Sequence, residues 1–189
     1  LHDRGAKVIA EDINPAIEEL ARPGLVTLQA DITEDGAAER AVALAIEQFG
    51  RLDILVNNAG VADVMKVEDT SVEDWDRVMA VNAKGTFLMC HAAVEAMRRN
   101  DGNGGAIVNV ASIMGLVGYP TSLPLSDGFT AYPHSKGAVV QLTRDMGVRL
   151  AQEGIRINAV CPGAVDTHML YSERGDTVEE VRAANLATI

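Results

Sequence analysis

Short runs of apolar residues alternate along the chain with longer segments in which apolar residues recur every three or four positions. The short runs lack the strict apolar–polar alternation of a half-exposed strand, so they predict strands that are covered on both faces. We expect five such strands, at residues 7–11, 26–29, 54–57, 106–110 and 156–160. Strands that alternate with helices form a parallel sheet, and the pattern therefore predicts an α/β fold.

Three of the longer segments are predicted to be helices, at residues 37–49, 71–79 and 133–152. The first is followed by Gly50, a residue that often ends a helix in the left-handed conformation. Ser71 and Asp74 resemble a capping box at the start of the second. Residues 115–130 contain several Pro and Gly residues and show no period, which predicts a loop.

No repeat, low-complexity stretch or linker divides the sequence, so we expect residues 1–189 to form a single domain. The chain opens at Leu1 without an initiator Met or a signal-peptide pattern. It closes at Ile189, inside a segment that has the composition of a helix. We therefore expect both ends to be cut from a longer protein.

The composition is that of a globular protein, with 48% hydrophobic and 23% charged residues. Sixteen basic residues against 27 acidic ones give a formal net charge of −11, which repels nucleic-acid phosphates and anionic lipids. We therefore expect no nucleic acid and no membrane as partners, and no apolar run is long enough to cross a bilayer. The two cysteines, Cys90 and Cys161, suit a reducing compartment, so we expect a cytoplasmic location.

The residues with the clearest chemistry are Ser112, Tyr132 and Lys136. Tyr132 and Lys136 are four positions apart, so on a helix they project from one face. A neighbouring ammonium favours the phenolate and is expected to lower the pKa of Tyr132 from its ordinary value of about 10. Ser112 follows the strand at 106–110, and ligands of open α/β sheets bind at that end of a strand. Taken alone, the spacing of the Tyr and the Lys also arises by chance.

Five segments, in the expected order between Ala6 and about Met169, resemble the short-chain dehydrogenase/reductase family. They are Asn57-Asn58-Ala59-Gly60, Asn82 within residues 81–86, Ser112 within residues 108–112, the Tyr-x-x-x-Lys pattern of Tyr132 and Lys136, and Pro162-Gly163 followed by Thr167. The resemblance implies a Rossmann-type, doubly wound parallel sheet in three α/β/α layers, a dinucleotide-binding and catalytic domain, and a homodimer or homotetramer.

The same resemblance implies an oxidoreductase that transfers a hydride between NAD(H) and a secondary alcohol or ketone. Tyr132 is then the general acid/base, and Lys136 lowers its pKa and binds the nicotinamide ribose. Ser112 orients the substrate oxygen, and Asn82 positions a water that connects Lys136 to solvent. We keep two alternatives: a catalytically idle relative that binds a dinucleotide as a regulatory or scaffold protein, and a sugar-nucleotide epimerase.

The choice of cofactor depends on Asp12, which follows the strand at 7–11. An acidic residue at this place accepts hydrogen bonds from the adenosine ribose and repels a 2′-phosphate. No Lys or Arg stands at Ile13 or Asn14, so NAD is expected over NADP. Without the family context, the favoured interpretation of Asp12 is a solvated turn residue before Asn14-Pro15. The cofactor contacts expected from the resemblance are Asp12, Asp31, Ile32, Asn58, Ala59, Gly60, Tyr132, Lys136, Pro162, Gly163, Val165 and Thr167. No spacing of Cys and His indicates a metal site.

The sequence departs from the family pattern at both ends. The first strand and the Gly-rich phosphate turn are absent, and residues 1–5 are interpreted as the tail of the helix that would follow that turn. The absent strand belongs between the strands at 7–11 and 54–57. The last strand and most of the substrate-covering segment after Met169 are also missing. We therefore expect residues 1–189 to be inactive alone.

The segment between Ser112 and Tyr132 is longer than the family pattern, since the two residues are 20 positions apart. If both residues meet at one substrate oxygen, residues 113–131 have to loop outward. This loop is expected to shape the substrate pocket. The alternative is a surface or subunit-contact insertion without a role in recognition.

Overall fold

The computed structural model describes residues 1–62, 70–100, 102, 104–118, 131–163, 165 and 167. All five predicted strands are confirmed, to within one residue at either end. They are β1 (Val8–Asp12), β2 (Leu25–Gln29), β3 (Ile54–Asn57), β4 (Gly105–Val110) and β5 (Ile155–Val160). Every pairing between them is parallel, so the chain has the predicted α/β fold.

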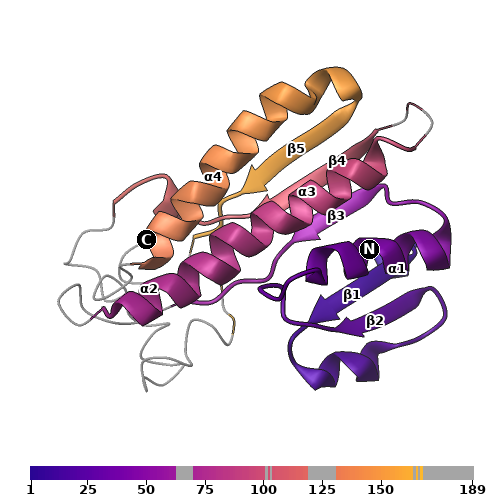
Figure 1. Cartoon of the computed structure of the whole chain (residues 1–189), viewed down its shortest axis with the longest axis horizontal. Helices are drawn as coiled ribbons and strands as arrows, with labels where there is room; N and C mark the ends of the chain where they lie inside the picture. Colours follow the sequence, from indigo (N-terminus) through magenta and orange to yellow (C-terminus); the bar gives the residue numbers. More distant parts are fainter. Residues whose placement is uncertain are drawn as a thin grey trace.

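The strands form two separate sheets, one of β1 and β2 and one in the order β3-β4-β5 (Figure 1). Among the described residues, no strand lies between β1 and β3. Instead, a cavity of about 860 Å³ is lined by both of these strands and by helix α1 (Ala37–Phe49). The cavity occupies the position predicted for the absent first strand of the family fold.

The predicted helices are present, with one shift. Helix α2 (Val72–Met79) is capped as expected, because the Ser71 hydroxyl accepts a hydrogen bond of 3.0 Å from the Asp74 amide. Helix α4 (Ala131–Leu150) begins two residues earlier than predicted. Tyr132 therefore lies in its first turn, where the following Pro133 removes no hydrogen bond of the helix. The 3₁₀ turn η6 (Ala151–Glu153) then leads to Gly154, which has a φ of 71°.

The long helical segment that follows α2 was not predicted from the sequence. Helix α3 (Thr86–Met97) is buried on most of its circumference and lacks the apolar stripe that identifies a surface helix. It is preceded by a π-helical segment, η4 (Ala80–Gly85), which includes Asn82. Single-turn π segments inside helices occur often at functional sites.

Helices α1, α3 and α4 lie on one face of the strands (Figure 1). The main core forms between this layer and the larger sheet and includes Met97, Ile107 and Ile155, which are fully buried. On the opposite face of the sheet, the side chains of Ile54, Val56 and Val160 remain about half exposed. Apolar side chains on both faces are typical of the strands of a doubly wound sheet.

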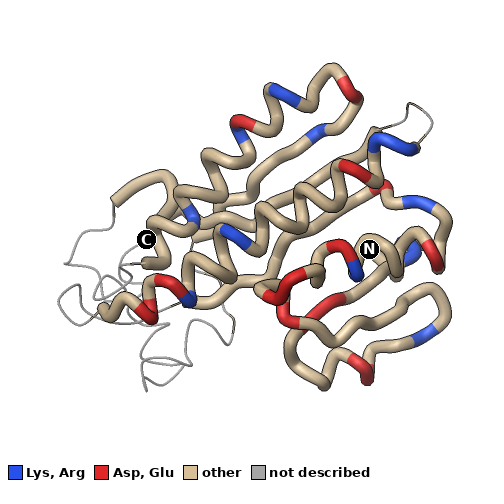
Figure 2. Tube along the Cα trace, in the orientation of Figure 1, with Lys and Arg blue, Asp and Glu red and all other residues tan. Residues whose placement is uncertain are grey.

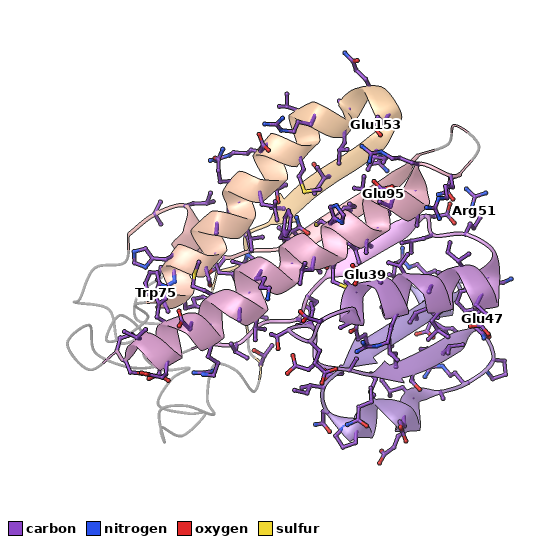
Figure 3. All side chains as sticks on the ribbon, viewed as in Figure 1. Glu39, Glu47, Arg51, Trp75, Glu95 and Glu153 are labelled. Atoms are coloured by element: carbon purple, nitrogen blue, oxygen red, sulfur yellow. The ribbon has the colours of Figure 1, made fainter. Side chains whose placement is uncertain are left out.

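Polar contacts tie the ends of the helices together. Arg98, which directly follows α3, forms ion pairs with Glu95 and with Glu153 of η6 (Figure 3). At the other end of the layer, the ring of Trp75 lies 5.2 Å from the ring of His134 in α4. Acidic and basic residues are spread over the β1–β2 part and the helices rather than gathered on one element (Figure 2). In the part of the chain that the structure describes, no helix combines the length and apolarity of a membrane span.

Candidate active site

Ser112, Tyr132 and Lys136 meet where β4 ends and α4 begins. Ser112 directly precedes the 3₁₀ turn η5 (Ile113–Gly115), and its side chain forms a hydrogen bond with the Tyr132 hydroxyl. The Lys136 amine lies 5.6 Å from the centre of the Tyr132 ring. Ser112 and Lys136 are 7% and 4% exposed, and Tyr132 is partly buried beside them. The structure thus brings together the three residues that the sequence singled out.

The electrostatics of this trio differ from the expectation. Burial raises the pKa of Tyr132, and the hydrogen bond with Ser112 only partly opposes that rise. Burial also lowers the pKa of Lys136 to about 8, and its amine donates a 2.8 Å hydrogen bond to the Val110 carbonyl. The expected lowering of the Tyr132 pKa by Lys136 is not found, because desolvation dominates at both groups and the amine bonds to the backbone.

Asn82 is the fourth expected catalytic residue, and its side chain is completely buried. Its amide oxygen accepts a hydrogen bond of 2.9 Å from the Val61 amide, and its amide nitrogen donates one of 2.8 Å to the Val61 carbonyl. The same nitrogen donates to the hydroxyl of Ser135 at 2.9 Å. Asn82 therefore holds the segment after β3 against the first turn of α4.

Ser135 is a site residue that the sequence reasoning missed. Its hydroxyl accepts from Asn82 and donates a 2.7 Å hydrogen bond to the backbone carbonyl of Tyr132, and it is fully buried. A Ser directly before Lys136 on the buried face of a predicted helix is the signal that could have identified it.

The cavity between β1 and β3 also gathers the residues expected to bind the adenosine half of the cofactor. Its lining includes Asp12, Asp31, Ile32, Asn58, Ala59 and Gly60. Asp12 ends β1, and one of its carboxylate oxygens accepts a 2.9 Å hydrogen bond from the Asn14 amide. This hydrogen bond is typical of a turn residue, which was the alternative interpretation of Asp12. Asp12 also lines the cavity, as a residue that binds the cofactor would. Asp31 caps the next turn by accepting hydrogen bonds from the amide and the hydroxyl of Thr33.

Gly60 connects this cavity with the buried trio. A Cβ built on Gly60 would lie 3.2 Å from the amide oxygen of Asn82 and 3.4 Å from the amine of Lys136. Such distances are tighter than ordinary contacts, so a side chain here would press on both groups. Gly60 therefore lies between the cavity that it lines and the amine of Lys136.

The expected nicotinamide segment follows β5. The Pro162 carbonyl accepts a 2.9 Å hydrogen bond from the Ile113 amide, which fixes this segment beside the turn after Ser112. Thr167 donates to the carbonyl of Val165, and both residues are exposed. Gly163 has open space where a side chain would be. Pro162 is thus brought to the trio, whereas Val165 and Thr167 contact each other.

The long loop between Ser112 and Tyr132 is described only as far as Gly118. Residues 119–130, including the apolar positions expected to shape the substrate pocket, lie outside the described residues. The role of this loop in recognition stays a prediction.

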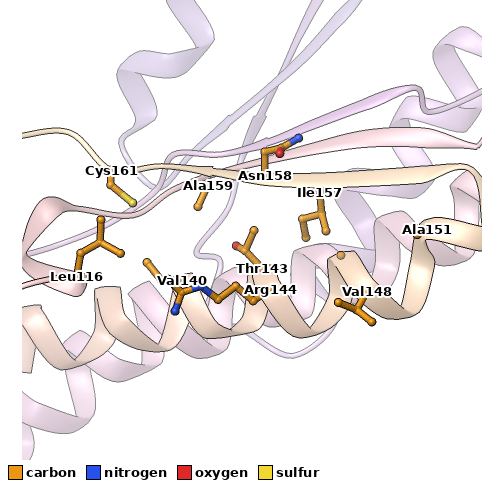
Figure 4. A pocket seen from close by; sticks show the side chains of 11 residues that line it. Leu116, Val140, Thr143, Arg144, Val148, Ala151, Ile157, Asn158, Ala159 and Cys161 are labelled. Carbon is orange, nitrogen blue, oxygen red and sulfur yellow. The ribbon is translucent and has the colours of Figure 1, made fainter.

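A second cavity, of about 650 Å³, lies between α4 and β5 (Figure 4). Its walls include Val140, Thr143, Val148, Ile157 and Cys161. None of Ser112, Tyr132, Lys136 and Asn82 lines it, so it is separate from the candidate site.

A buried polar network supports the strands below the site. The Asn57 amide in β3 donates hydrogen bonds to the Cys90 sulfur and to Asn109 of β4, and Asn109 donates to the hydroxyl of Thr143 in α4. Burial raises the pKa of Cys90 to about 11, so its thiol stays protonated and is not a nucleophile at neutral pH. The network joins β3, β4 and α4 with no chemistry of its own.

The comparisons with known proteins decide the family. A family model described as short chain dehydrogenase matches residues 1–177. The chain belongs to the short-chain dehydrogenase family.

Two relatives illustrate the range within this short-chain dehydrogenase family. A 2-(R)-hydroxypropyl-CoM dehydrogenase of Xanthobacter autotrophicus is 41% identical over 177 residues, which are 88% of this chain and 67% of the relative. A protein of the same organism named inactive 2-(S)-hydroxypropyl-CoM dehydrogenase 2 is 44% identical over 167 residues, 85% of this chain and 68% of the relative. The chain thus spans about two thirds of the length of these relatives.

Two solved structures of similar proteins contain nicotinamide cofactors. A 3-ketoacyl-(acyl-carrier-protein) reductase from Brucella melitensis complexed with NADH has a TM-score of 0.82 and 31% identity, covering 92% of this chain and 72% of that one. The protein ElxO with NADP bound has a TM-score of 0.78 and 30% identity, covering 90% and 68%. The family and these neighbours support a nicotinamide-dinucleotide-dependent oxidoreductase that acts on CH–OH groups.

Proposed function

We propose that the protein transfers a hydride between NAD(H) and a secondary alcohol or ketone, with Tyr132 as the general acid/base. The observation that carries this proposal is the position of the buried Lys136 amine, 5.6 Å from the centre of the Tyr132 ring, in the helix turn that packs against the segment after Ser112. A chain without catalytic activity has no need to bury an amine and a phenol together, because both are costly to desolvate.

In alcohol oxidation, the Tyr132 phenolate takes the proton of the substrate hydroxyl while the carbinol carbon loses a hydride. The bound nicotinamide supplies the acceptor for that hydride. The Ser112 hydroxyl holds the substrate oxygen next to Tyr132. In ketone reduction the same steps run in reverse, and Tyr132 donates the proton to the carbonyl oxygen.

The protonation states suggest how Tyr132 becomes a base. Its pKa is raised in the chain alone, so the phenolate needs positive charge nearby. Lys136 carries that charge below its pKa of about 8, and an oxidised nicotinamide adds a second positive charge. We therefore propose that Lys136 and the bound cofactor together bring the pKa of Tyr132 into the working range, and that Lys136 also holds the nicotinamide ribose.

Asn82 is proposed as a residue that positions the proton path at Lys136. Both hydrogens of its amide are donated to protein groups, to Val61 and to Ser135. The amide oxygen lies near both Gly60 and the Val61 amide and retains a second lone pair that can accept a hydrogen bond from a water.

The preference for NAD is proposed from Asp12, a carboxylate at the end of β1 that lines the cofactor cavity. Similar proteins bind either NADH or NADP, so the family does not decide between them. The other proposed cofactor contacts are Asp31, Ile32, Asn58, Ala59, Gly60, Pro162, Gly163, Val165 and Thr167.

Residues 1–189 are proposed to form a single domain that contains the catalytic residues. We propose that this domain has no activity when it is expressed without the rest of the protein. Among the described residues, one edge of β1 and one edge of β3 pair with no strand, and the side chains of Ile54 and Val56 are about half exposed. Both features support this proposal, because unpaired strand edges and exposed apolar faces destabilise a sheet. A homodimer or homotetramer is proposed from the family. A cytoplasmic location is proposed because Cys90 and Cys161 are both free thiols.

A second candidate is a catalytically idle protein that binds a dinucleotide. The 44% identical relative that is named inactive favours it, because close similarity in this family does not guarantee turnover. The two candidates differ in whether the trio performs proton transfer.

The experiment that separates them is NAD reduction by the full-length protein with 2-propanol, 2-butanol, cyclopentanol and cyclohexanol. We expect turnover of at least one alcohol and a loss of about 100-fold or more in kcat in Tyr132→Phe. NADH binding should be nearly unchanged in that variant, because it loses one hydroxyl. Saturable NADH binding without turnover of any alcohol or of the matching ketones would favour the idle protein.

A further inference from the structure

The turn η5 is in contact with two of the segments that build the site. Ser112 is its N-cap, and the Ser112 hydroxyl accepts a 3.2 Å hydrogen bond from the Met114 amide. Its first residue, Ile113, donates to the Pro162 carbonyl. Gly115 ends the turn and donates its amide to the Ser112 carbonyl at 3.0 Å. The position of Ser112 therefore depends on where this turn lies against its neighbours.

Gly115 lies directly on the backbone of α4. A Cβ at Gly115 would stand 2.6 Å from the carbonyl carbon and 2.7 Å from the carbonyl oxygen of Lys136, and 2.8 Å from the amide nitrogen of Gly137. These atoms belong to a hydrogen-bonded helix and cannot rotate aside as the end of a side chain can. Gly115 is not among the glycines with positive φ, so its backbone conformation does not require glycine. Glycine is needed here for space.

We propose that Gly115 is a positioning residue, whose close contact with Lys136 and Gly137 sets the separation between Ser112 and Tyr132. The proposal rests on the proposed function, because it concerns the hydrogen bond between those two residues. Non-bonded carbon atoms keep a separation of about 3.5 Å or more, so a methyl group at Gly115 has to move η5 from α4 by roughly 1 Å. A hydrogen bond between hydroxyl groups does not survive lengthening of that size.

Loss of the hydrogen bond between Ser112 and Tyr132 changes the pKa of Tyr132, which a general loss of stability does not do. The bond with Ser112 lowers the pKa of Tyr132 against the effect of burial. When η5 moves away, the pKa of Tyr132 rises further, and the activity in alcohol oxidation requires a higher pH. The substrate oxygen also loses the hydroxyl that holds it, which lowers kcat.

Gly118 provides a matched control in the same segment. It is exposed, its φ is not positive, and no atom of the described residues lies within 4 Å of a Cβ built on it. Gly118→Ala makes the same chemical change as Gly115→Ala without the collision. Gly137→Val tests the same contact from helix α4. A Cβ at Gly137 would lie 3.7 Å from the Gly115 carbonyl oxygen, so the branched side chain of Val would press on that oxygen.

The test measures kcat, the KM for NAD and the pKa of Tyr132 in the full-length variants. The pKa is followed by NMR of isotopically labelled tyrosine, and Tyr132→Phe assigns the signal. For Gly115→Ala we expect about a 100-fold loss of kcat with the KM for NAD within about threefold, since a displacement of roughly 1 Å at a reacting group costs this much. The pKa of Tyr132 should rise, and Gly118→Ala should leave both this pKa and the KM for NAD unchanged.

If Gly115→Ala does not fold, Gly137→Val is expected to give the same rise in the pKa of Tyr132. The titration needs no turnover, so it tests the contact even if the proposed function is wrong. A rise in the pKa of Tyr132 in a protein that oxidises no alcohol would support the contact and contradict the function. A folded Gly115→Ala or Gly137→Val protein with an unchanged pKa of Tyr132 would overturn the positioning role.

Discussion

The side-chain amide of Asn82 donates a 2.9 Å hydrogen bond to the hydroxyl of Ser135, a residue 53 positions later, and both side chains are fully buried. The Ser135 hydroxyl in turn donates a hydrogen bond of 2.7 Å to the backbone carbonyl of Tyr132. A single chain of hydrogen bonds therefore runs from the π-helical segment to the first turn of α4. The backbone that carries Tyr132 and Lys136 is held by a residue outside α4.

Removal of the Ser135 hydroxyl should destabilise this contact. Ser135→Ala leaves one amide hydrogen of Asn82 buried without its acceptor, which costs about 1–3 kcal/mol in the free energy of unfolding. Denaturant unfolding measures the loss. In an Asn82→Ala background the same substitution should cost much less, because the partner is already gone. Equal costs in the two backgrounds would show that the two side chains act independently.

Replacement of Asp12 should narrow the preference for NAD. Asp12→Ala removes a carboxylate that repels a 2′-phosphate and that accepts hydrogen bonds from the ribose. We expect the ratio of kcat/KM for NAD to that for NADP to fall by about 10-fold or more, a change of about 1.4 kcal/mol. Asp76→Ala, which removes an exposed charge on α2, should leave the ratio unchanged. A wild-type protein that uses NADP better than NAD would contradict this role of Asp12.

Glu11 should make stability depend on pH. One of its carboxylate oxygens is buried without a hydrogen-bond partner among the described residues, and burial raises its pKa from 4.5 to about 7 against the opposing charge of Arg40. The folded state thus binds the proton more tightly than the unfolded state. Stability is highest below the unfolded pKa and falls as the pH rises from 4.5 to about 7.

Glu11→Gln removes the titrating group at nearly constant shape. Unfolding measured well above the folded pKa should show a gain of about 1 kcal/mol, a figure reduced for the partial exposure of the side chain. The gain should vanish below the unfolded pKa, where Glu11 is protonated in both states. Glu39→Gln, which changes an exposed carboxylate of α1 (Figure 3), is the control and should show no such dependence. A pH-independent gain in Glu11→Gln would mean that folding does not shift the pKa of Glu11.

The sequence predicted the elements whose signals are local. Compact apolar runs in the sequence predict the strands. Ser71 and Gly50 predict the start of α2 and the end of α1, and the structure confirms both positions. Ser112, Tyr132 and Lys136 were recognised from spacing and order, and the structure places them together.

Features that depend on packing could not be predicted in this way. Helix α3 is buried on most of its circumference, and its exposed stripe includes the apolar Phe87 beside His91 and Glu95, so no wide polar face reveals its period. The need for glycine at Gly115 arises from the backbone of α4, which follows in the sequence only after the long loop. The pKa of Tyr132 was expected to fall because Lys136 is four residues away, whereas desolvation, which depends on the whole fold, raises it.

The most direct test of the central claim follows a deuterium atom. The full-length protein is given NAD and a secondary alcohol deuterated at its carbinol carbon, such as 2-propanol or cyclopentanol, and the cofactor is analysed by mass spectrometry after one turnover. We expect the deuterium on the reduced nicotinamide with the wild-type protein, and almost none with Tyr132→Phe in the same time. A reduced cofactor without deuterium, or equal transfer by Tyr132→Phe, would contradict hydride transfer with Tyr132 as the acid/base.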